Sequence, residues 1–427
     1  MATTPPTAVR IRAYDVGFGD CFLLTFRYPG GDRHLLIDFG SFPKAKRAGA
    51  GNLPAIAAHI RDSCNGQLHA VVATHRHADH INGFARNANG TGSGDIIRGC
   101  RPEVVVQPWT EHPKLDPEAT GAHGFAPADR KHVAALKGID AFLTALTGQV
   151  RRRPRQWRSV AKQLAFLGED GISNRSAVEN LMTMATTPKG QRYVCYGRSA
   201  GLGAVLPGVK VRVLGPPTID QLSGIETQRR KDEAEFWHLL GASAAGMADT
   251  GGSPFAARHR LSSIPGYARW LVDHADANLR QQLLSIVRRM DDVLNNTSVI
   301  LLFQVGTKKL LFPGDAQIEN WSFALSKPSV QKLLADVDVY KVGHHGSLNA
   351  TPKASLWEPF SRKGKGPNDL MTFLSTESGH HGTEGKGTEV PRLTLVEALQ
   401  QDSRLMQTGV NNPGGQAVAF VEQELAV

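Results

Sequence analysis

The hydrophobic positions near the N-terminus occur in short runs that glycine-containing turns separate. The runs VRIRAYDV, CFLLTFRYP and RHLLIDFG are rich in aliphatic and aromatic residues, and GFGD and GGD lie between them. Apolar runs of this length between turn residues predict three β-strands joined by tight turns. The next apolar positions predict a helix over residues 52–62, and the run LHAVVATH predicts a buried strand that ends at His75.

Further along the chain, strand-like runs alternate with two blocks of a different pattern. The segments PEVVVQPW, RYVCYG, VKVRVLGPP, TSVILLFQV, KKLLFP and DVDVYKV predict strands. The blocks at about 110–190 and 218–292 predict helices instead. Strands that alternate with helices are typical of sheets covered by helices, so we expect an α/β fold. We expect a single domain over residues 1–427, into which the two helical blocks are inserted.

Composition narrows the class of protein. A hydrophobic content of 41% is typical of a soluble globular protein, and no apolar stretch approaches the length that spans a bilayer. The N-terminal residues lack the apolar core of a signal peptide, and the four scattered cysteines contain no C-x-x-C pair. We therefore expect a cytoplasmic protein with no membrane insertion, no disulfide framework and no thiolate zinc site.

The net charge of +10 favours acidic partners, nucleic acid among them. The first helical block contains the run RRRPRQWR, whose arginines and tryptophan suit the gripping of a phosphate backbone and the stacking of a base. These residues are Arg151, Arg152, Arg153, Arg155, Trp157 and Arg158. A solvated helix face or an oligomer contact explains the same run equally well. The two helical blocks are also natural places for a protein partner to bind.

The segment VVATHRHADHING carries the chain's densest group of metal-binding residue types. His75, His77, Asp79 and His80 follow directly after an apolar run. Imidazole nitrogens and carboxylate oxygens bind divalent metals, and a chain that leaves a sheet can curl around an ion. His75 and His77 lie two positions apart, so in an extended segment they point the same way and share one metal. Asp79 and His80 then turn toward a second position, and residues 81–83 fit the start of a helix.

Other acidic and histidine residues follow apolar strands elsewhere in the chain. Asp38 closes LLID, Asp315 follows LLFP, and His344 and His345 follow VYKV. Because the ends of neighbouring strands meet at one edge of a sheet, we expect these residues to complete a site for two metal ions. Asp315 is the natural carboxylate to bridge the two ions. His344 and His345 stand at the same strand end, and either can supply a ligand.

The pattern H-x-H-x-D-H after a strand, with Asp38 before it and Asp315 and His344 after it, resembles the metallo-β-lactamase superfamily. The segments YDVGFGDCFLLTF, LLIDFGS, THRHADHING, VRVLGPP, NNTSVILLF, LLFPGDA and VYKVGHHGS resemble one branch, the soluble hydrolase (nuclease) domain of ComEC-type competence proteins. The later segments FLSTESGHHG, VPRLTLVEAL and LMQTGVNNPGGQAVAF resemble the C-terminal portion of that domain. The two helical blocks have no counterpart in it.

The resemblance implies an αββα sandwich with two divalent metal ions, zinc or manganese, at one edge. The implied ligands are His75, His77, Asp79, His80, Asp315 and His344, with Asp38 steadying the ligand loop from behind. Many members of the superfamily have a further histidine where this chain has Asn295 and Asn296, and the ComEC-type branch also has asparagines there. We therefore expect that position, with Asn296 foremost, to contact water or substrate.

Two divalent cations together activate a water molecule for hydrolysis. Besides binding a metal, Asp79 is expected to orient that nucleophile. In SGHHGTEG, His381 is the expected proton donor and His380 a substrate contact, although a glycine-rich loop with incidental histidines explains the pair equally well. Ser347 is expected either to bind a substrate oxygen or to cap the following helix.

Three hypotheses on function follow from these residues. The first is a metal-dependent phosphodiesterase, a nuclease that acts on DNA or RNA. The second is a hydrolase of a small ester, such as a phosphodiester or a lactone, with the helical blocks folded over the metals as a lid. The third is an effector subunit that a partner activates, or a binding module that keeps the fold without catalysis. An intact set of metal ligands favours the two hydrolases over the third.

Overall fold

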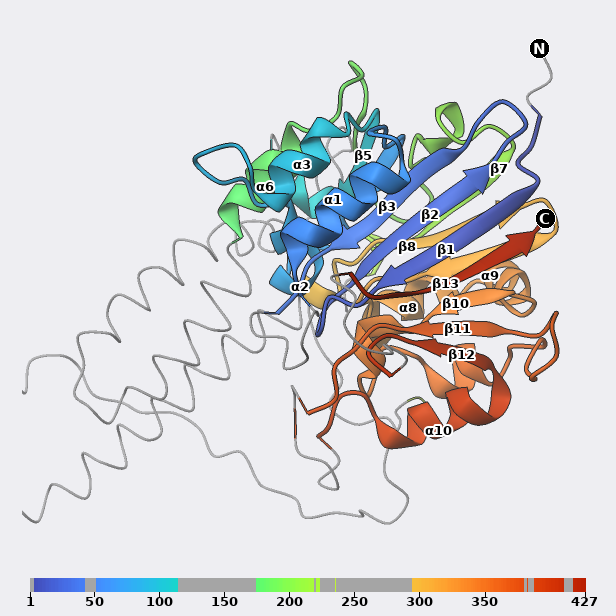
Figure 1. The fold of residues 1–427 in the computed structure, drawn as a ribbon. Coiled ribbons are helices and arrows are strands. Elements are labelled where there is room, and N and C mark those ends of the chain that lie inside the picture. Colours follow the sequence, from blue (N-terminus) through green and yellow to red (C-terminus); the bar gives the residue numbers. More distant parts are fainter. Residues whose placement is uncertain are drawn as a thin grey trace, which may run out of the picture.

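The computed structural model describes residues 4–42, 51–113, 174–218, 220–222, 235, 294–379, 382, 388–410 and 418–427. Within these residues the chain forms two β-sheets that pack face to face, with helices on both outer surfaces (Figure 1). The architecture is therefore an αββα sandwich, which confirms the expected α/β fold class.

The first sheet has seven strands in the order β13-β1-β2-β3-β4-β5-β6. Their bounds are β1 Ala8–Tyr14, β2 Cys21–Arg27, β3 Arg33–Phe39, β4 Ala70–Val72, β5 Val104–Pro108, β6 Gln191–Val194 and β13 Phe420–Ala426. The three predicted N-terminal strands are confirmed, and they pair antiparallel. From β3 to β6 the pairing is parallel. Strand β13 pairs antiparallel with β1, so the last residues of the chain lie beside the first strand.

The second sheet has six strands in the order β12-β11-β10-β9-β8-β7. Their bounds are β7 Val209–Gly215, β8 Ile300–Val305, β9 Lys308–Phe312, β10 Val339–Lys341, β11 Met371–Leu374 and β12 Arg404–Gln407. Strands β7, β8 and β9 pair antiparallel, whereas β9 to β12 pair parallel. Because β9 and β10 run the same way, the segments that follow them leave the sheet at the same edge.

Helices cover the outer face of each sheet. On the first sheet these are α1 Leu53–Ser63, α3 Ser93–Gly99 and α6 Arg175–Met182, and on the second α8 Ile318–Leu325, α9 Pro328–Leu334 and α10 Leu393–Asp402 (Figure 1). Helix α2 Ala78–Ile81 follows β4. Shorter helical turns occur at Asn82–Phe84, Trp109–Glu111, Leu202–Ala204, Gly343–Gly346 and Lys353–Trp357. None of the described helices is both long and apolar enough to cross a bilayer.

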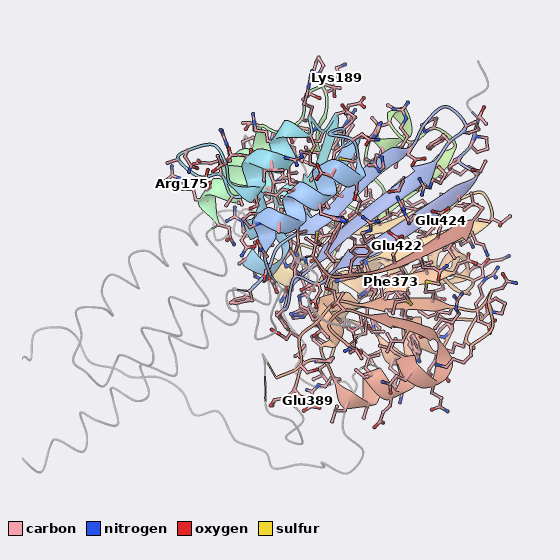
Figure 2. All side chains as sticks on the ribbon, viewed as in Figure 1. Arg175, Lys189, Phe373, Glu389, Glu422 and Glu424 are labelled. Atoms are coloured by element: carbon pink, nitrogen blue, oxygen red, sulfur yellow. The ribbon has the colours of Figure 1, made fainter. Side chains whose placement is uncertain are left out.

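Side-chain alternation along the strands produces three hydrophobic layers. In β3, Leu35 and Ile37 point into the layer between the two sheets, whereas Leu36 points toward the helices. Phe22 of the first sheet and Phe312 of the second meet in the central layer, with ring centroids 5.6 Å apart. Phe373 lies in the same layer (Figure 2). Because both faces of these strands are buried, they read in the sequence as continuous apolar runs.

At the outer edge of the first sheet, charged residues hold β13 in register. Glu422 pairs with Arg12 of β1, and Glu424 pairs with Arg27 of β2 (Figure 2). Just after β4, the backbone amide of Val299 donates to the carbonyl of Thr74 at 2.9 Å. This bond joins the segment before β8 to the segment after β4, so the two sheets meet where the predicted metal ligands leave their strands.

The two predicted helical insertions lie mostly outside the described residues. Residues 114–173, 223–234 and 236–293 belong to that part, and the Arg-rich run and most of both blocks fall within it. Of the first block, residues 110–113 and 174–190 are described, and the second of these ranges contains α6. The division of the chain into one domain with two insertions therefore stays a prediction.

Candidate metal centre

The H-x-H-x-D-H segment forms a loop and a short helix directly after β4. His77 has extended backbone angles and precedes α2, which begins at Ala78. The sequence predicted a helix start at residues 81–83. A short helical turn does begin there, at Asn82, but it follows directly on α2, which the prediction missed. Asp79 lies in the first turn of α2, where a carboxylate interacts favourably with the helix dipole. Asp79 and His80 therefore project from a helical turn, and all four predicted ligands are buried.

Two glycines allow neighbouring loops to press against α2. A side chain at Gly40 would collide with the backbone of Ala78 and His80. At Gly19, where φ is +151°, a Cβ atom would lie only 2.7 Å from the carbonyl oxygen of Asp79. The loops that follow β1 and β3 are thus in backbone contact with the helix that carries Asp79 and His80.

Asp38 fixes the ligand loop through hydrogen bonds to Thr74 and His80. Its Oδ1 accepts the Thr74 amide at 2.7 Å, and its Oδ2 accepts the Thr74 hydroxyl at 2.7 Å. The same Oδ2 accepts Nδ1 of His80 at 2.8 Å. Burial raises the pKa of the Asp38 carboxyl, and the proximity of His80 opposes that shift. Because Asp38 occupies Nδ1, His80 directs its Nε2 toward the centre of the cluster.

Asp315 stands at the middle of the cluster. It follows β9 after Pro313 and Gly314, and its backbone amide is bonded to the Ser298 hydroxyl at 3.2 Å. Its Oδ2 lies 2.9 Å from Nε2 of His80, 3.5 Å from Nε2 of His345 and 3.9 Å from Nε2 of His344. One carboxylate oxygen therefore faces three imidazoles that come from two different sheets.

The structure distinguishes the two adjacent histidines that follow β10. Both adopt left-handed backbone angles, with φ of +42° for His344 and +51° for His345. His345 is fully buried, and its Nδ1 donates to the carbonyl of Ser375 at 2.9 Å. This leaves Nε2 of His345 3.2 Å from Oδ2 of Asp79. Left-handed conformations of non-glycine residues are strained, and they occur preferentially at functional sites.

His344 points to a different side of the same turn. Its side chain is 25% exposed, and its Nδ1 lies 2.9 Å from the Ser347 hydroxyl. One group of described ligand atoms that lie within 4.8 Å of one another belongs to Asp79, His80, Asp315 and His345. The cluster thus contains His345 where the sequence favoured His344, because the two successive left-handed residues turn the second histidine inward. Ser347 ends this helical turn, and both its amide and its hydroxyl contact His344.

The remaining two histidines of the motif lie beside this cluster. Nε2 of His75 lies 3.0 Å from Nδ1 of His77, and the rings of His75 and His80 have centroids 4.2 Å apart. Burial lowers the pKa of His75 well below its usual value, and the nearby His80 and His77 lower it further. His75 is therefore neutral at physiological pH, the form in which imidazole binds a metal.

The buried carboxylates of the cluster favour positive charge beside them. Burial alone would raise the pKa values of Asp79 and Asp315, yet His80 and His345 hold both pKa values low. Conversely, burial alone would lower the pKa of His80, but Asp315, Asp38 and Asp79 raise it well above its usual value. A divalent metal supplies the same positive charge and replaces the imidazole protons. The donor set of two imidazole Nε2 atoms and two carboxylates, each imidazole held at Nδ1, fits such an ion.

Two charged residues at the site were not predicted from the sequence. Lys341, the last residue of β10, and Asp20, at the end of the GFGD turn, are both buried and form an ion pair. Burial alone would lower the pKa of Lys341, but Asp20 and Asp315 raise it above its usual value. The sequence does contain one indication, the lysine inside the apolar run VDVYKV. Because lysine is rarely buried unless it is paired, a lysine in a buried strand predicts an acidic partner nearby.

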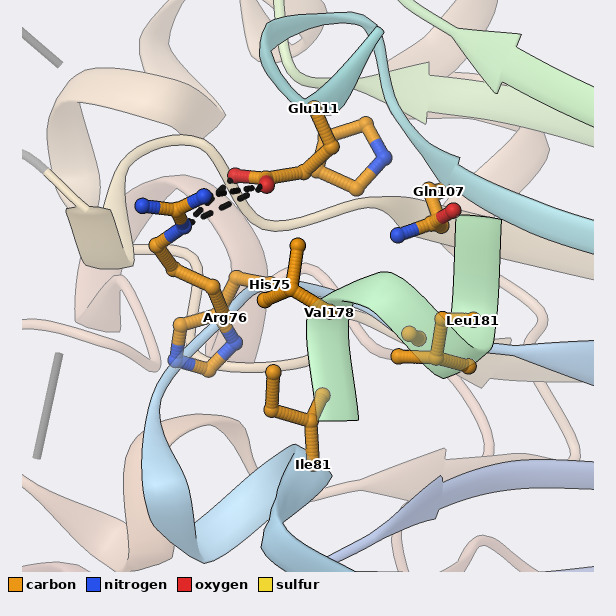
Figure 3. A pocket seen from close by; sticks show the side chains of 9 residues that line it. His75, Arg76, Ile81, Gln107, Glu111, Val178 and Leu181 are labelled. Carbon is orange, nitrogen blue, oxygen red and sulfur yellow. Dashed lines mark hydrogen bonds and ion pairs between the residues drawn. The ribbon is translucent and has the colours of Figure 1, made fainter. Parts of the chain in front are cut away.

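A further ion pair fixes the ligand loop to the end of β5. Arg76 lies between His75 and His77 in the sequence and donates from Nε and Nη2 to both carboxylate oxygens of Glu111, at 2.8 to 3.2 Å. Figure 3 shows this pair at the rim of a small pocket that His75 and Gln107 also line. Two parallel bonds from a guanidinium define orientation as well as distance, so the pair restrains the loop between the two histidines.

The other predicted site residues have different positions. Asn296 donates to Glu319 at 3.3 Å and accepts the amide of Asn320 at 3.3 Å, so its described contacts fasten the start of α8. His380 and His381 lie outside the described residues, as do Arg151, Arg152, Arg153, Arg155, Trp157 and Arg158. Their predicted roles are therefore not tested by the geometry.

Comparison with known proteins agrees with this geometry. The sequence model of the metallo-β-lactamase superfamily matches residues 14–141, which include the H-x-H-x-D-H segment. A search of the curated proteins finds no match. The αββα sandwich is the metallo-β-lactamase fold, and the superfamily match together with the buried His/Asp cluster indicates a metal-dependent hydrolase.

Proposed function

We propose that the protein is a metal-dependent phosphodiesterase that cleaves nucleic acid. The observation that carries the proposal is the buried cluster of Asp79, His80, Asp315 and His345, in which two carboxylates and two imidazoles converge from both sheets. The metal-dependent hydrolase class rests on this cluster and on the superfamily match; the choice of a phosphodiester substrate is the step beyond it.

The metal ions are proposed to be two divalent cations, zinc or manganese. The residues that would hold them are His75, His77, Asp79, His80, Asp315 and His345, with His344 at the rim. When bound, such ions lower the pKa of a water molecule and stabilise negative charge on a phosphoryl group. An oxygen-rich donor set accepts manganese more readily than a set made only of histidines.

The protein's own residues would orient these ligands and the substrate. Asp38 holds the His80 ring by Nδ1, and the Ser375 carbonyl holds the His345 ring in the same way. His344 is the partly exposed histidine of the pair, and Ser347 fixes its ring. We infer that His344 contacts the bound substrate, since it combines exposure with proximity to Asp315.

Three features of the sequence support nucleic acid as the substrate. The net charge is +10, which favours a polyanionic partner. The run RRRPRQWR combines guanidinium groups with an indole ring, a combination that suits single-stranded nucleic acid. The motif segments resemble the nuclease domain of ComEC-type competence proteins more specifically than the superfamily at large.

A cleavage assay tests the proposal. Labelled single-stranded DNA, duplex DNA and RNA are incubated with the full chain plus manganese, zinc or a chelator. We expect cleavage of at least one substrate with metal and none with chelator. Asp79→Ala is expected to reduce the rate by about 10²-fold or more, because it removes a metal ligand. The matched control is Asp62→Ala, an exposed aspartate on α1.

The outcomes separate the alternatives. Cleavage that Asp79→Ala abolishes and Asp62→Ala preserves supports a nuclease. If all three nucleic acids survive incubation with protein that carries metal, the nuclease proposal is wrong. Hydrolysis of a small phosphodiester or lactone under those same conditions would then identify a hydrolase of small esters.

A further inference from the structure

Lys341 is a charged residue at a place where charge is costly. Its side chain is 2% exposed, at the end of the central strand β10. Its Nζ donates to the carbonyl of Gly314 at 3.0 Å and lies 3.3 Å from Oδ1 of Asp315. It also forms an ion pair with Oδ2 of Asp20. Such a group is retained in a protein interior only when it is paired and hydrogen-bonded.

The two carboxylate oxygens of Asp315 have different neighbours. Oδ2 faces Nε2 of His80 and of His345, at 2.9 and 3.5 Å. Oδ1 faces Lys341 instead. One oxygen of the Asp315 carboxylate therefore lies beside the two histidines of the cluster, and the other lies beside the ammonium group of Lys341.

Asp20 lies on the same side of the cluster as Lys341 and close to two of its histidines. Its Oδ2 lies 3.7 Å from Nδ1 of His80, and its Oδ1 lies 3.6 Å from Nδ1 of His345. Ligand atoms of Asp20, Asp38 and His80 lie within 4.8 Å of one another and form a second acidic group behind the first. Among the described residues that pair with Asp20, Lys341 is the permanent cation, since the histidines carry charge only when protonated.

The charges of the cluster explain why a cation is needed there. Four buried aspartates, Asp20, Asp38, Asp79 and Asp315, surround the imidazoles. Among the described residues, Lys341 is the only lysine or arginine that pairs with both Asp20 and Asp315, so without it their carboxylates would share no permanent cation. Hard divalent cations bind such sets of carboxylate and carbonyl oxygens, and the Gly314 carbonyl adds a further oxygen.

We propose that Lys341 is a positioning residue of the metal centre: its ammonium is a built-in cation that closes the Asp20 side of Asp315 to metal ions. The metals are thereby confined to the side of Asp315 that faces His80 and His345. The inference rests on the proposed metal centre, and it is independent of which substrate the protein cleaves.

Replacing the lysine tests the proposal through metal content and stability. The full chain with Lys341→Met is equilibrated with excess manganese, freed of unbound metal and analysed by mass spectrometry for ions per chain. We expect about one more ion per chain than in the wild type, because the tethered cation no longer blocks the oxygens of Asp20 and Asp315. In chelator, the variant is expected to melt several degrees below the wild type, and manganese should recover most of that loss.

Two further variants complete the experiment. Lys309→Met removes a lysine of β9 that pairs with Asp336 near the surface, and it is expected to leave the ion count unchanged. Asp20→Asn with Lys341→Met removes one negative and one positive charge together. This pair is expected to bind the wild-type number of ions and to melt above Lys341→Met in chelator.

The ion counts test the proposal even if Lys341→Met does not fold without metal, because they are made on protein equilibrated with manganese. A wild-type ion count in Lys341→Met, or an extra ion in the Asp20→Asn/Lys341→Met variant, would overturn the proposal. So would a Lys341→Met protein that melts in chelator as Lys309→Met does. Because these measurements count ions and melting temperatures, a failure of the nuclease proposal leaves them unaffected.

Discussion

At the scale of single residues, the site depends on which atom of each histidine is already occupied. Asp38 binds Nδ1 of His80, and the Ser375 carbonyl binds Nδ1 of His345, so both rings offer Nε2 to the same space. Hydrogen bonds of this kind fix the tautomer of a metal-binding histidine. His344 is held by the Ser347 hydroxyl and remains partly exposed. The two neighbours are therefore not equivalent, although they have the same side chain.

This difference predicts unequal effects on metal binding. His345→Ala is expected to weaken manganese affinity by more than the roughly 10–100-fold that loss of an outer hydrogen-bond partner costs. His344→Ala is expected to change the affinity by less than about tenfold, while it lowers cleavage. Isothermal titration of the metal-free proteins measures both affinities. A larger loss of affinity in His344→Ala than in His345→Ala would contradict the assignment.

The sequence alone predicts most of the candidate ligands but not this distinction. His75, His77, Asp79, His80 and Asp315 stand out because they follow apolar strands. The choice between His344 and His345 depends on two consecutive left-handed backbone conformations, and no residue pattern predicts these for non-glycine residues. Asp20 and Lys341 become recognisable only when the strands that carry them pack together, since their contact joins residues distant in the chain.

At the scale of elements, the strands separate two sets of histidines. Asp38 lies near the carboxyl end of β3, whereas His34 lies near its amino end. The His34 amide donates to Nδ1 of His69 at 3.0 Å, and the His69 amide donates to the His34 carbonyl at 2.9 Å. Thr25 lies 3.1 Å from Nδ1 of His34. This second pair is thus a structural link between β3 and the residue before β4.

The link predicts a loss of stability in acid. Burial lowers the pKa of His34 and of His69 to about 4, with nearby arginines adding to the effect. In the unfolded chain both groups titrate near 6.5, so between about pH 6.5 and 4 the unfolded state binds more protons than the folded state. Stability is therefore expected to fall as pH decreases through this window and to be unaffected by these groups above it.

Thermal melts of metal-free protein at pH 7.5, 6.0 and 4.5 measure the effect. His69→Asn keeps an acceptor for the His34 amide and removes the titrating group, so its melting temperature is expected to fall less between pH 6.0 and 4.5 than that of the wild type. The remaining histidines are the same in both proteins, which makes the difference specific to His69. Identical pH profiles for the two proteins would refute the prediction.

The elements themselves were largely predictable from the sequence. The apolar runs that predict strands correspond to β1 to β10, and the helix predicted over 52–62 corresponds to α1. Strands β11, β12 and β13 were not predicted. The residues of β12 and β13 are mostly half-buried and lack a clear apolar run, and the four buried residues of β11 are too short a run. The short helix α2, which precedes the helix start predicted at 81–83, was missed, since four residues carry too little periodicity to be recognised.

At the scale of the whole molecule, the sandwich joins ligands that are far apart in the chain. Asp79 comes from the first sheet and His345 from the second, 266 residues later, yet their side chains lie 3.2 Å apart. The bond between the Val299 amide and the Thr74 carbonyl joins the sheets at this same edge. Metal binding is therefore expected to tie the two halves of the sandwich together and to stabilise the fold as a unit.

The number of metal ions bound per chain is the direct test of the candidate metal centre. The wild-type chain and Asp315→Asn are reconstituted with zinc or manganese, freed of unbound metal and analysed for ions per chain. Because Asp315 is the carboxylate that faces His80, His344 and His345, we expect bound divalent metal in the wild type and a marked loss in the variant. Folded wild-type protein that retains no divalent metal after reconstitution would contradict this expectation.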